Sequence, residues 1–127
     1  MVNPARDVTA AELAILEKLW EHESAAVKEL SQWLYGASTP SDIATVQKLL
    51  VRLEGKDWVT RNRETWPHQF KAAFERKELI SQRLQSTADE LCDGTMNTLL
   101  THLVKSDRFN ARERQRLRKL LDDLDSK

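Results

Sequence analysis

One side of the segment at residues 43–56 carries side chains whose types and spacing could read a DNA duplex. Its apolar residues recur at steps of three and four, which predicts a helix with one buried face; they are Val46, Leu49, Leu50 and Leu53. The opposite face carries Ala44, Thr45, Gln47, Lys48, Val51 and Arg52, and Ser41 precedes it. Small side chains permit close approach to DNA, amides can hydrogen-bond to base edges, and cations can meet phosphates. We therefore expect major-groove contacts from Ser41, Ala44, Thr45, Gln47, Lys48 and Arg52.

A short basic hairpin is expected directly after this helix. Gly55-Lys56-Asp57 should end the helix, and residues 58–63 and 68–74 read as two strands joined by a turn at residues 64–67. The hairpin cations Arg61, Arg63 and Lys71 are either phosphate contacts, which we favour beside such a helix, or ordinary solvated strand residues. Trp66 at the turn could probe a minor groove, although a turn aromatic more often packs on its own hairpin.

Two earlier helices must position these residues. Thr9 and Glu12 have the spacing of a capping box, which predicts a first helix running to about Glu21. A second helix is expected over Val27–Tyr35, and Gly36 and Pro40 should flank the loop before the third helix. Three helices followed by a hairpin predict a winged helix-turn-helix DNA-binding domain over residues 1–74.

The pattern beyond Phe74 is helical throughout, so the expected fold class is mainly α with a small β-hairpin. Helices are predicted over residues 75–92, with a stripe of Ile80, Leu84, Thr87, Ala88 and Leu91, over residues 95–106, and from Asn110 onward with a second capping box to Glu113. Asp93-Gly94 separates the first of these predicted helices from the second. These helices cannot bury their apolar stripes alone, which predicts a C-terminal helical dimerisation arm over residues 75–127.

The residues expected at the dimer interface share one helical stripe: Met96, Leu99, Leu100, Leu103, Leu117, Leu120, Leu121 and Leu124. A closed twofold dimer is the commonest way for a soluble chain to cover such a surface. The alternative is an intramolecular helical hairpin folded onto the first domain.

Composition narrows the function classes. The 127 residues hold 20 Lys and Arg against 20 Asp and Glu, yet residues 41–74 carry six cations against four carboxylates. The single cysteine, Cys92, excludes an intrachain disulfide and a cysteine-only zinc site. The sequence shows neither a long apolar run nor a secretory signal, so we expect a cytoplasmic protein without a membrane partner. It also lacks catalytic, cofactor-binding and metal-binding motifs. We therefore expect no enzyme activity, no cofactor and no bound metal.

The order of these parts resembles the penicillinase-repressor family, which includes methicillin-resistance and copper-responsive repressors. Residues 12–20 (ELAILEKLW) resemble the family's first helix, and residues 44–54 (ATVQKLLVRLE) resemble its recognition helix. The resemblance covers nearly the whole chain. It implies a homodimer that binds a dyad-symmetric operator in double-stranded DNA and represses transcription, with Thr45 and Arg52 at positions that the family uses at the DNA.

Three positions depart from the family's pattern. Gln47 stands where some members have Arg, and glutamine fits adenine whereas arginine favours guanine. No cysteine follows Cys92, so the metal hook of the copper-responsive branch is missing. In another branch a signal-activated protease cuts an Asn-Phe bond in the arm, and this chain has His102-Leu103 at the matching place.

A second class of function is compatible with the same elements. A winged-helix domain can serve as a protein-interaction module without binding DNA, and the third helix would then meet a protein partner. Such a face would expose more Leu, Phe or Tyr than the predicted one, which carries Thr45, Gln47, Lys48 and Arg52. The composition of the face therefore favours a dimeric repressor over an interaction module.

Overall fold

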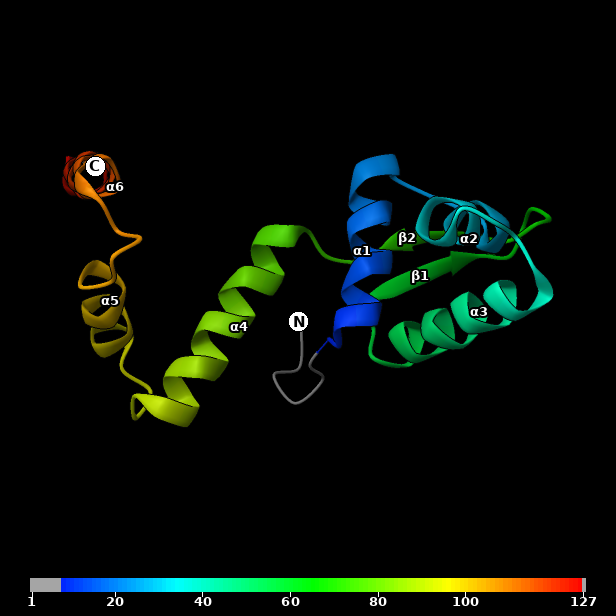
Figure 1. The fold of residues 1–127 in the computed structure, drawn as a ribbon, viewed down its shortest axis with the longest axis horizontal. Helices are drawn as coiled ribbons and strands as arrows, with labels where there is room; N and C mark the ends of the chain where they lie inside the picture. The colour runs from blue at the N-terminus through cyan, green and yellow to red at the C-terminus, as the bar shows by residue number, and fades with distance from the viewer. Residues whose placement is uncertain (1–7, 127) are drawn as a thin grey trace. The chain divides into compact units, whose positions relative to one another are not determined.

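The structure, a computed structural model, describes residues 8–126 and is mainly helical with one small β-hairpin (Figure 1). In chain order the elements are α1 (Ala10–His22), α2 (Val27–Tyr35), α3 (Pro40–Gly55), β1 (Val59–Asn62), β2 (Gln69–Ala72), α4 (Arg76–Leu91), α5 (Met96–Val104) and α6 (Ala111–Asp125). The expected fold class is thus confirmed. The chain forms two compact units, Met1–Arg83 and Leu84–Lys127, called the first and second units below.

The capping box at the start of α1 is confirmed. The Thr9 hydroxyl accepts a hydrogen bond from the Glu12 backbone N–H at 3.2 Å, and the Thr9 N–H donates to the Glu12 carboxylate at 2.8 Å. The reciprocal pair satisfies two N–H groups that a helix start leaves unpaired.

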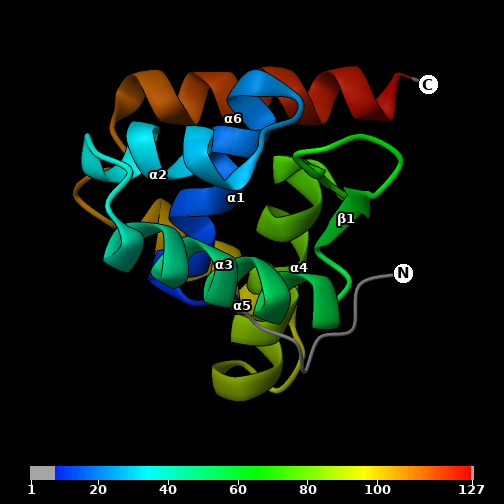
Figure 2. The ribbon, with the colours of Figure 1, turned by 90° about the vertical axis from the view of Figure 1, so that its right-hand side faces the viewer.

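Helix α3 begins earlier than the sequence pattern indicated. The helix was expected from residue 43, with Pro40 flanking the loop before it, but Pro40 occupies the first turn. Thr39 is the N-cap, and its hydroxyl accepts from the Asp42 N–H at 3.1 Å. Proline is well placed in a first turn because its φ suits the helix and its missing N–H would have no helical acceptor. Ser41 therefore lies within α3, in the same helix as the other α3 residues predicted to contact DNA. Figure 2 shows α3 along its length.

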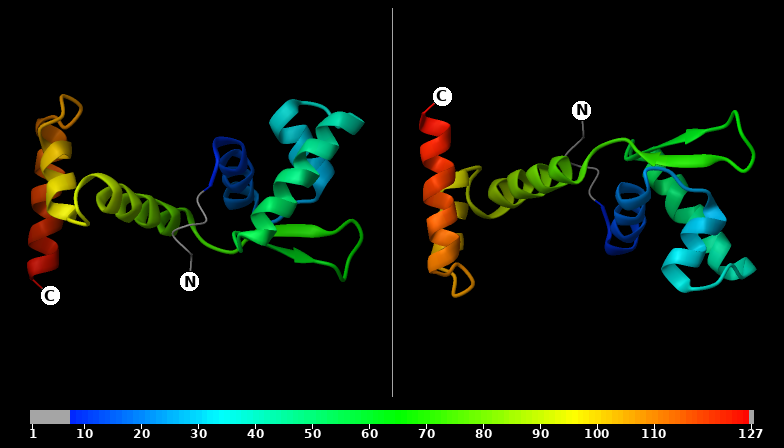
Figure 3. Two further views of the ribbon diagram at one scale, coloured as in Figure 1. Left: turned by 90° about the horizontal axis from the view of Figure 1, so that it is seen from below. Right: turned by 90° about the horizontal axis from the view of Figure 1, so that it is seen from above.

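The hairpin pairs antiparallel, with Arg61 opposite Phe70 and Thr60 opposite Lys71. Its two strands are shorter than the predicted ranges. Ala25, in the connection between α1 and α2, adds a single bridge to the sheet. The Ala25 N–H donates to the Phe70 carbonyl at 3.0 Å, and the Phe70 N–H donates to the Ala25 carbonyl at 2.8 Å. Ala25 therefore adds a third segment of backbone to the two strands, on the β2 side. The hairpin turn extends beyond the helices of the first unit (Figure 3).

One core holds the first unit together. Its fully buried side chains come from α1, α2, α3 and the start of the hairpin: Ile15, Leu16, Leu19, Leu30, Val46, Leu50, Leu53 and Trp58. The buried face of α3 matches the predicted one, because Val46, Leu49, Leu50 and Leu53 are all buried.

Helix α4 supplies Leu79 to this core, and Leu79 lies outside the stripe that the sequence pattern predicted. Leu79 is 4% exposed, whereas Ile80 is 51% exposed and Leu84 and Leu91, from the same predicted stripe, are also exposed. The helix carries apolar residues on adjacent faces, and the face that includes Leu79 packs into the first unit. In the single chain Ile80, Leu84 and Leu91 are therefore surface residues, whereas Ala88 of the same predicted stripe is buried.

Glu12 is a fully buried carboxylate with a cationic partner that the sequence did not indicate. Lys56, just after α3, donates to both of its oxygens at 2.7 and 3.0 Å. Burial by itself raises the pKa of Glu12, but the hydrogen bonds from Lys56 and Thr9 outweigh it and hold the pKa below its ordinary value of 4.5. The pair joins α1 to the end of α3.

Replacing Lys56 by Met should lower the free energy of unfolding at neutral pH by about 1.5–3 kcal/mol, because the buried carboxylate loses a charged hydrogen-bond donor. A carboxyl whose pKa is lowered by folding stabilises the protein above its unfolded pKa, and that contribution disappears as pH falls through the folded value. Urea unfolding should therefore show a difference between wild type and variant that shrinks below about pH 4.5.

Lys77→Met is the matched control, because Lys77 pairs with Glu75 at 3.3 Å with both side chains mostly exposed. An exposed pair adds little stability. An equal loss in the two variants, or a Lys56→Met effect that does not change with pH, would show that the Glu12 pair does not stabilise the fold.

The second unit contains the end of α4, then α5 and α6. At the interruption Asp93 and Gly94 have positive φ values of 51° and 77°, and the N–H groups of Cys92 and Gly94 both donate to the Ala88 carbonyl at 2.8 Å. Asn110 caps α6 by accepting from the Glu113 N–H at 3.0 Å. Only one of the two hydrogen bonds of the second predicted capping box forms among the described residues, because the Glu113 carboxylate accepts none from the Asn110 N–H.

Candidate nucleic-acid interface

The outer face of α3 presents every side chain predicted to contact DNA to solvent. Ser41, Ala44, Thr45, Gln47, Lys48 and Arg52 are all exposed. The Thr45 hydroxyl donates to the Ser41 carbonyl at 3.1 Å. Its hydrogen is therefore used within the helix, and its oxygen and methyl group remain available to a ligand.

Lys48 and Arg52 lie one helical turn apart on this face. Within the described residues neither forms an ion pair or a side-chain hydrogen bond. Gln47 beside them is likewise exposed, and its amide offers both a donor and an acceptor. The face therefore combines two unpaired cations with an amide, which suits a polyanion that carries hydrogen-bonding base edges.

The three hairpin cations do not share one surface. Because side chains alternate along a strand, Arg61 lies on the side of Phe70, whereas Lys71 lies with Thr60 on the opposite side. The Arg61 guanidinium carbon is 4.7 Å from the centre of the Phe70 ring, and its Nη2 is 3.0 Å from a Glu54 oxygen. Its side chain is only 20% exposed.

Arg63 and Lys71 are more accessible than Arg61. The Arg63 side chain is 65% exposed and lies 3.7 Å from the second Glu54 oxygen, and Lys71 is exposed without a partner in the described chain. Glu54 thus connects α3 to β1 by neutralising part of the hairpin's charge. The sequence did not indicate this role, although Glu54 was the only carboxylate in the second half of the predicted helix.

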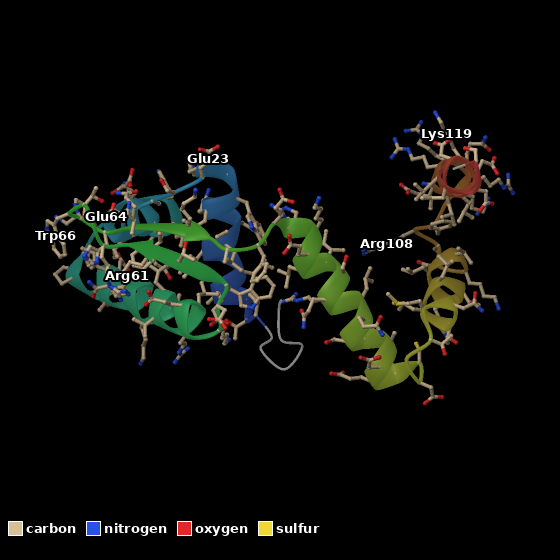
Figure 4. The ribbon with its side chains drawn as sticks, turned by 180° about the vertical axis from the view of Figure 1, so that it is seen from behind. Glu23, Arg61, Glu64, Trp66, Arg108 and Lys119 are labelled. Atoms are coloured by element: carbon tan, nitrogen blue, oxygen red, sulfur yellow. The ribbon has the colours of Figure 1, made fainter. Side chains whose placement is uncertain are left out.

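Trp66 stands at the tip of the hairpin and is 85% exposed (Figure 4). Its only ring partner among the described residues is His68, which meets it edge-on at 5.0 Å. A turn aromatic was expected to pack on its own hairpin, but Trp66 buries little of its side chain there. A large aromatic side chain therefore projects from the same end of the first unit as the exposed start of α3.

Three aromatic residues from distant parts of the sequence hold the exit of the hairpin. The Trp20 indole N–H donates to the Phe74 carbonyl at 2.7 Å, and the Phe74 ring meets the fully buried Trp58 edge-on at 5.5 Å. These contacts fix β2 against α1, and with it the hairpin beside α3. The hydrogen bond joins residues 54 positions apart, and no local sequence pattern indicates it.

The second unit exposes the apolar residues predicted for dimerisation. Met96, Leu100, Leu103, Leu120, Leu121 and Leu124 are 39–57% exposed, and Leu99 and Leu117 are half-buried. Each set recurs at steps of three and four, so it lies along one face of α5 or α6. With Leu84, the α5 residues line a shallow hollow of about 430 Å³.

Two further features bear on partners. In the described chain no helix is long and apolar enough to cross a membrane. Among the same residues no group of three or more His, Cys, Asp or Glu side chains could hold a metal ion.

Comparison with known proteins gives consistent matches over the whole structure. The sequence profile of the penicillinase repressor family matches residues 8–123. A penicillinase repressor from Bacillus licheniformis is 23% identical over 116 residues, which covers 91% of this chain and 90% of that protein. A penicillinase repressor from Staphylococcus aureus is 21% identical over 127 residues, which covers both chains completely.

Proposed function

The chain belongs to the penicillinase repressor family, whose members are DNA-binding transcriptional repressors and not enzymes, and from that premise we propose how it binds DNA. Two copies form a homodimer through the helical arm at residues 75–127. Each copy places α3 in the major groove of one half of a dyad-symmetric operator, and the hairpin contacts the backbone. The DNA-binding domain in this proposal is residues 1–74 with the first turns of α4 packed on it.

The observation that carries the proposal is the outer face of α3. Gln47, Lys48 and Arg52 are exposed there without charged partners in the described chain, directly opposite a face that is fully used by the core. Cations free of carboxylates can replace the counterions of DNA. Gln47 is the base-reading group, and its amide geometry favours adenine.

The competing function, a protein-interaction module, fits this face less well. Within α3 as described, Val51 is the one large apolar side chain that is mostly exposed, at 58%. The cores of protein interfaces are depleted in charged residues and enriched in aromatic ones. A face that carries Lys48, Arg52 and small polar residues has the opposite composition.

A second copy of the chain is the partner that best covers the apolar faces of α5 and α6. The exposed apolar residues of each helix lie on one of its faces, and apolar surfaces of this kind on single chains usually mark interfaces. Homodimers with twofold symmetry are the commonest solution.

The charges of α6 support a self-complementary contact. Its first nine residues carry five cations against one carboxylate, Glu113, and its last four carry three carboxylates. The cations are Arg112, Arg114, Arg116, Arg118 and Lys119, and the three carboxylates are Asp122, Asp123 and Asp125. In the described chain none of these side chains forms an ion pair. Two α6 helices running antiparallel about a twofold axis would bring the cationic half of each to the acidic half of the other, whereas a parallel pair would align like charges.

A signal-activated protease is the third partner in the proposal. The bond between His102 and Leu103 lies inside α5, and both residues are exposed. A cut there would separate Leu103 from the rest of the α5 face. The dimer contact, and not the DNA-reading face, would then be the target of the signal.

Substitutions on α3 should separate affinity from sequence preference. Lys48→Ala and Arg52→Ala should each weaken binding to any duplex by about 1–3 kcal/mol where a good contact is lost, because cations act mainly on the backbone. Gln47→Ala should relax the preference at one base position and leave the other positions unchanged. Lys77→Ala, an exposed lysine away from α3, is the control and should bind as wild type does.

The test is selection of genomic DNA by the purified full-length protein and each variant, followed by sequencing. A dyad-symmetric motif is expected for wild type, and fluorescence anisotropy on that duplex then gives the affinities. Failure to enrich any motif would reject sequence-specific repression. The same motif from wild type and Gln47→Ala would remove Gln47 from base reading.

A further inference from the structure

A groove of about 720 Å³ opens in the first unit beside the outer face of α3. It lies between the start of α2, one edge of α3 and the hairpin. Its lining residues are mostly apolar, with a few polar side chains: Ala26, Val27, Lys28, Ile43, Gln47, Val51, Arg61, Trp66, Pro67, His68 and Phe70. The volume falls within the range of small-molecule sites, and an apolar lining with a few polar groups is their usual composition.

None of the ionisable side chains that line the groove is acidic. Lys28, Arg61 and His68 line it, and no carboxylate does. Glu54, which holds Arg61, lies outside the lining. A ligand in the groove would therefore meet the cations Lys28 and Arg61 among mostly aromatic and aliphatic side chains.

Arg61 is the group best placed to orient such a ligand. It donates one hydrogen bond, from Nη2 to Glu54, and its Nε is buried without a hydrogen-bond partner in the described chain. A guanidinium has five N–H donors in a planar fork that matches a carboxylate. An unsatisfied buried donor is costly, so an added acceptor at Arg61 would be favourable.

We propose that this groove binds a small aromatic carboxylate, and that the bound molecule antagonises DNA binding. The ring would pack against Val27, Val51 and the Trp66–Pro67 tip, and the carboxylate would meet Arg61. The antagonism follows from position, because Gln47 and Trp66 line the groove and also belong to the surface proposed to face DNA. This second half rests on the proposed function, whereas binding of the molecule does not.

A DNA phosphate is the other anion that could reach these cations. It has no apolar body, and most of the groove's lining would then lose its hydration without gaining a packing partner. The apolar walls therefore favour an organic anion. The two sources of negative charge give different results in a binding experiment.

The test uses the full chain and follows backbone amide signals by NMR as 2-naphthoate is added. Saturable shifts are expected in α2, α3 and the hairpin, with a Kd of about 1 mM or lower for a ligand of this size. The neutral 2-naphthamide should bind at least about tenfold more weakly, because it lacks the charge that Arg61 pairs with. Equal binding of the amide, absence of saturable shifts in the groove, or the same shifts with inorganic phosphate would overturn the site.

Val51→Glu supplies a variant that should still fold, because Val51 is 58% exposed. A carboxylate at this edge should weaken 2-naphthoate binding by at least about tenfold through loss of apolar contact and repulsion. Ile80→Glu is the matched control, since it makes the same change at a similarly exposed site outside the groove. Equal weakening in both variants would place the ligand elsewhere.

The regulatory half is tested on the duplex recovered by genomic selection. Saturating 2-naphthoate should raise the apparent Kd for that duplex at least about tenfold, and by linkage the duplex should weaken 2-naphthoate binding by the same factor. Groove binding with unchanged DNA affinity would overturn the antagonism. If the ligand-free protein does not bind DNA, the proposed function is rejected. The NMR result still decides whether the groove binds the anion.

Discussion

Leu103→Asp should lower the affinity for the selected operator by about 10²–10⁴-fold, although Leu103 would touch no base in the proposed complex. A single winged domain makes few phosphate contacts and should bind only modestly. In a dimer the second α3 binds at the high effective concentration that the first contact creates. A charge on the exposed α5 face would oppose the apolar contact that joins the two copies.

Thr98→Asp is the control for this prediction. It adds the same charge to the same helix, but Thr98 lies on the side opposite Met96, Leu100 and Leu103. Sedimentation should find a monomer for Leu103→Asp and a dimer for Thr98→Asp, with the circular dichroism of both close to wild type. Wild-type operator affinity in a proven Leu103→Asp monomer would refute the coupling between dimerisation and DNA binding.

Local periodicity predicted the elements of the first unit well because their buried faces are regular. The apolar residues of α3 repeat along one face, and all four are buried as expected. The capping pair Thr9 and Glu12 marked the start of α1 for the same reason, since both hydrogen bonds are made within one turn. Features whose cause lies within a few residues can be read from the sequence.

Contacts between distant segments could not be read in this way. The bridge from Ala25 to Phe70, the Lys56 pair with Glu12 and the Trp20 bond to Phe74 each join residues more than forty positions apart. Alternation along the hairpin could have separated Arg61 from Lys71, but which side faces the core depends on where α3 lies. The partner of Arg61 follows from that placement, because Glu54 can reach β1 only in the folded unit.

Helix α4 shows why an apolar stripe does not by itself identify the buried face. The sequence predicted a stripe that begins at Ile80, yet Leu79 enters the core of the first unit. Both residues are large and aliphatic, so composition does not distinguish them. The difference is set by the direction in which the chain leaves the hairpin at Phe74, which Trp20 and Trp58 hold in place.

Leu79→Ala should therefore lower the free energy of unfolding of the full chain by about 2–5 kcal/mol, through lost burial and the cavity left behind. Ile80→Ala removes a similar side chain one residue later, but its site is 51% exposed in the single chain, so its cost should be much smaller. Urea unfolding followed by tryptophan fluorescence gives both values on the first unit, because all four tryptophans lie within it.

The same pair of variants separates packing within the first unit from contact between copies. If Leu79→Ala is destabilising at every protein concentration, its effect arises within one chain, because dimer stability depends on concentration. If Ile80→Ala proves the more destabilising and its cost falls on dilution, the predicted stripe of α4 belongs to the dimer interface. A larger cost for Ile80→Ala that does not change with concentration would contradict the position of α4 on the first unit, and with it the packing of Leu79 against the core.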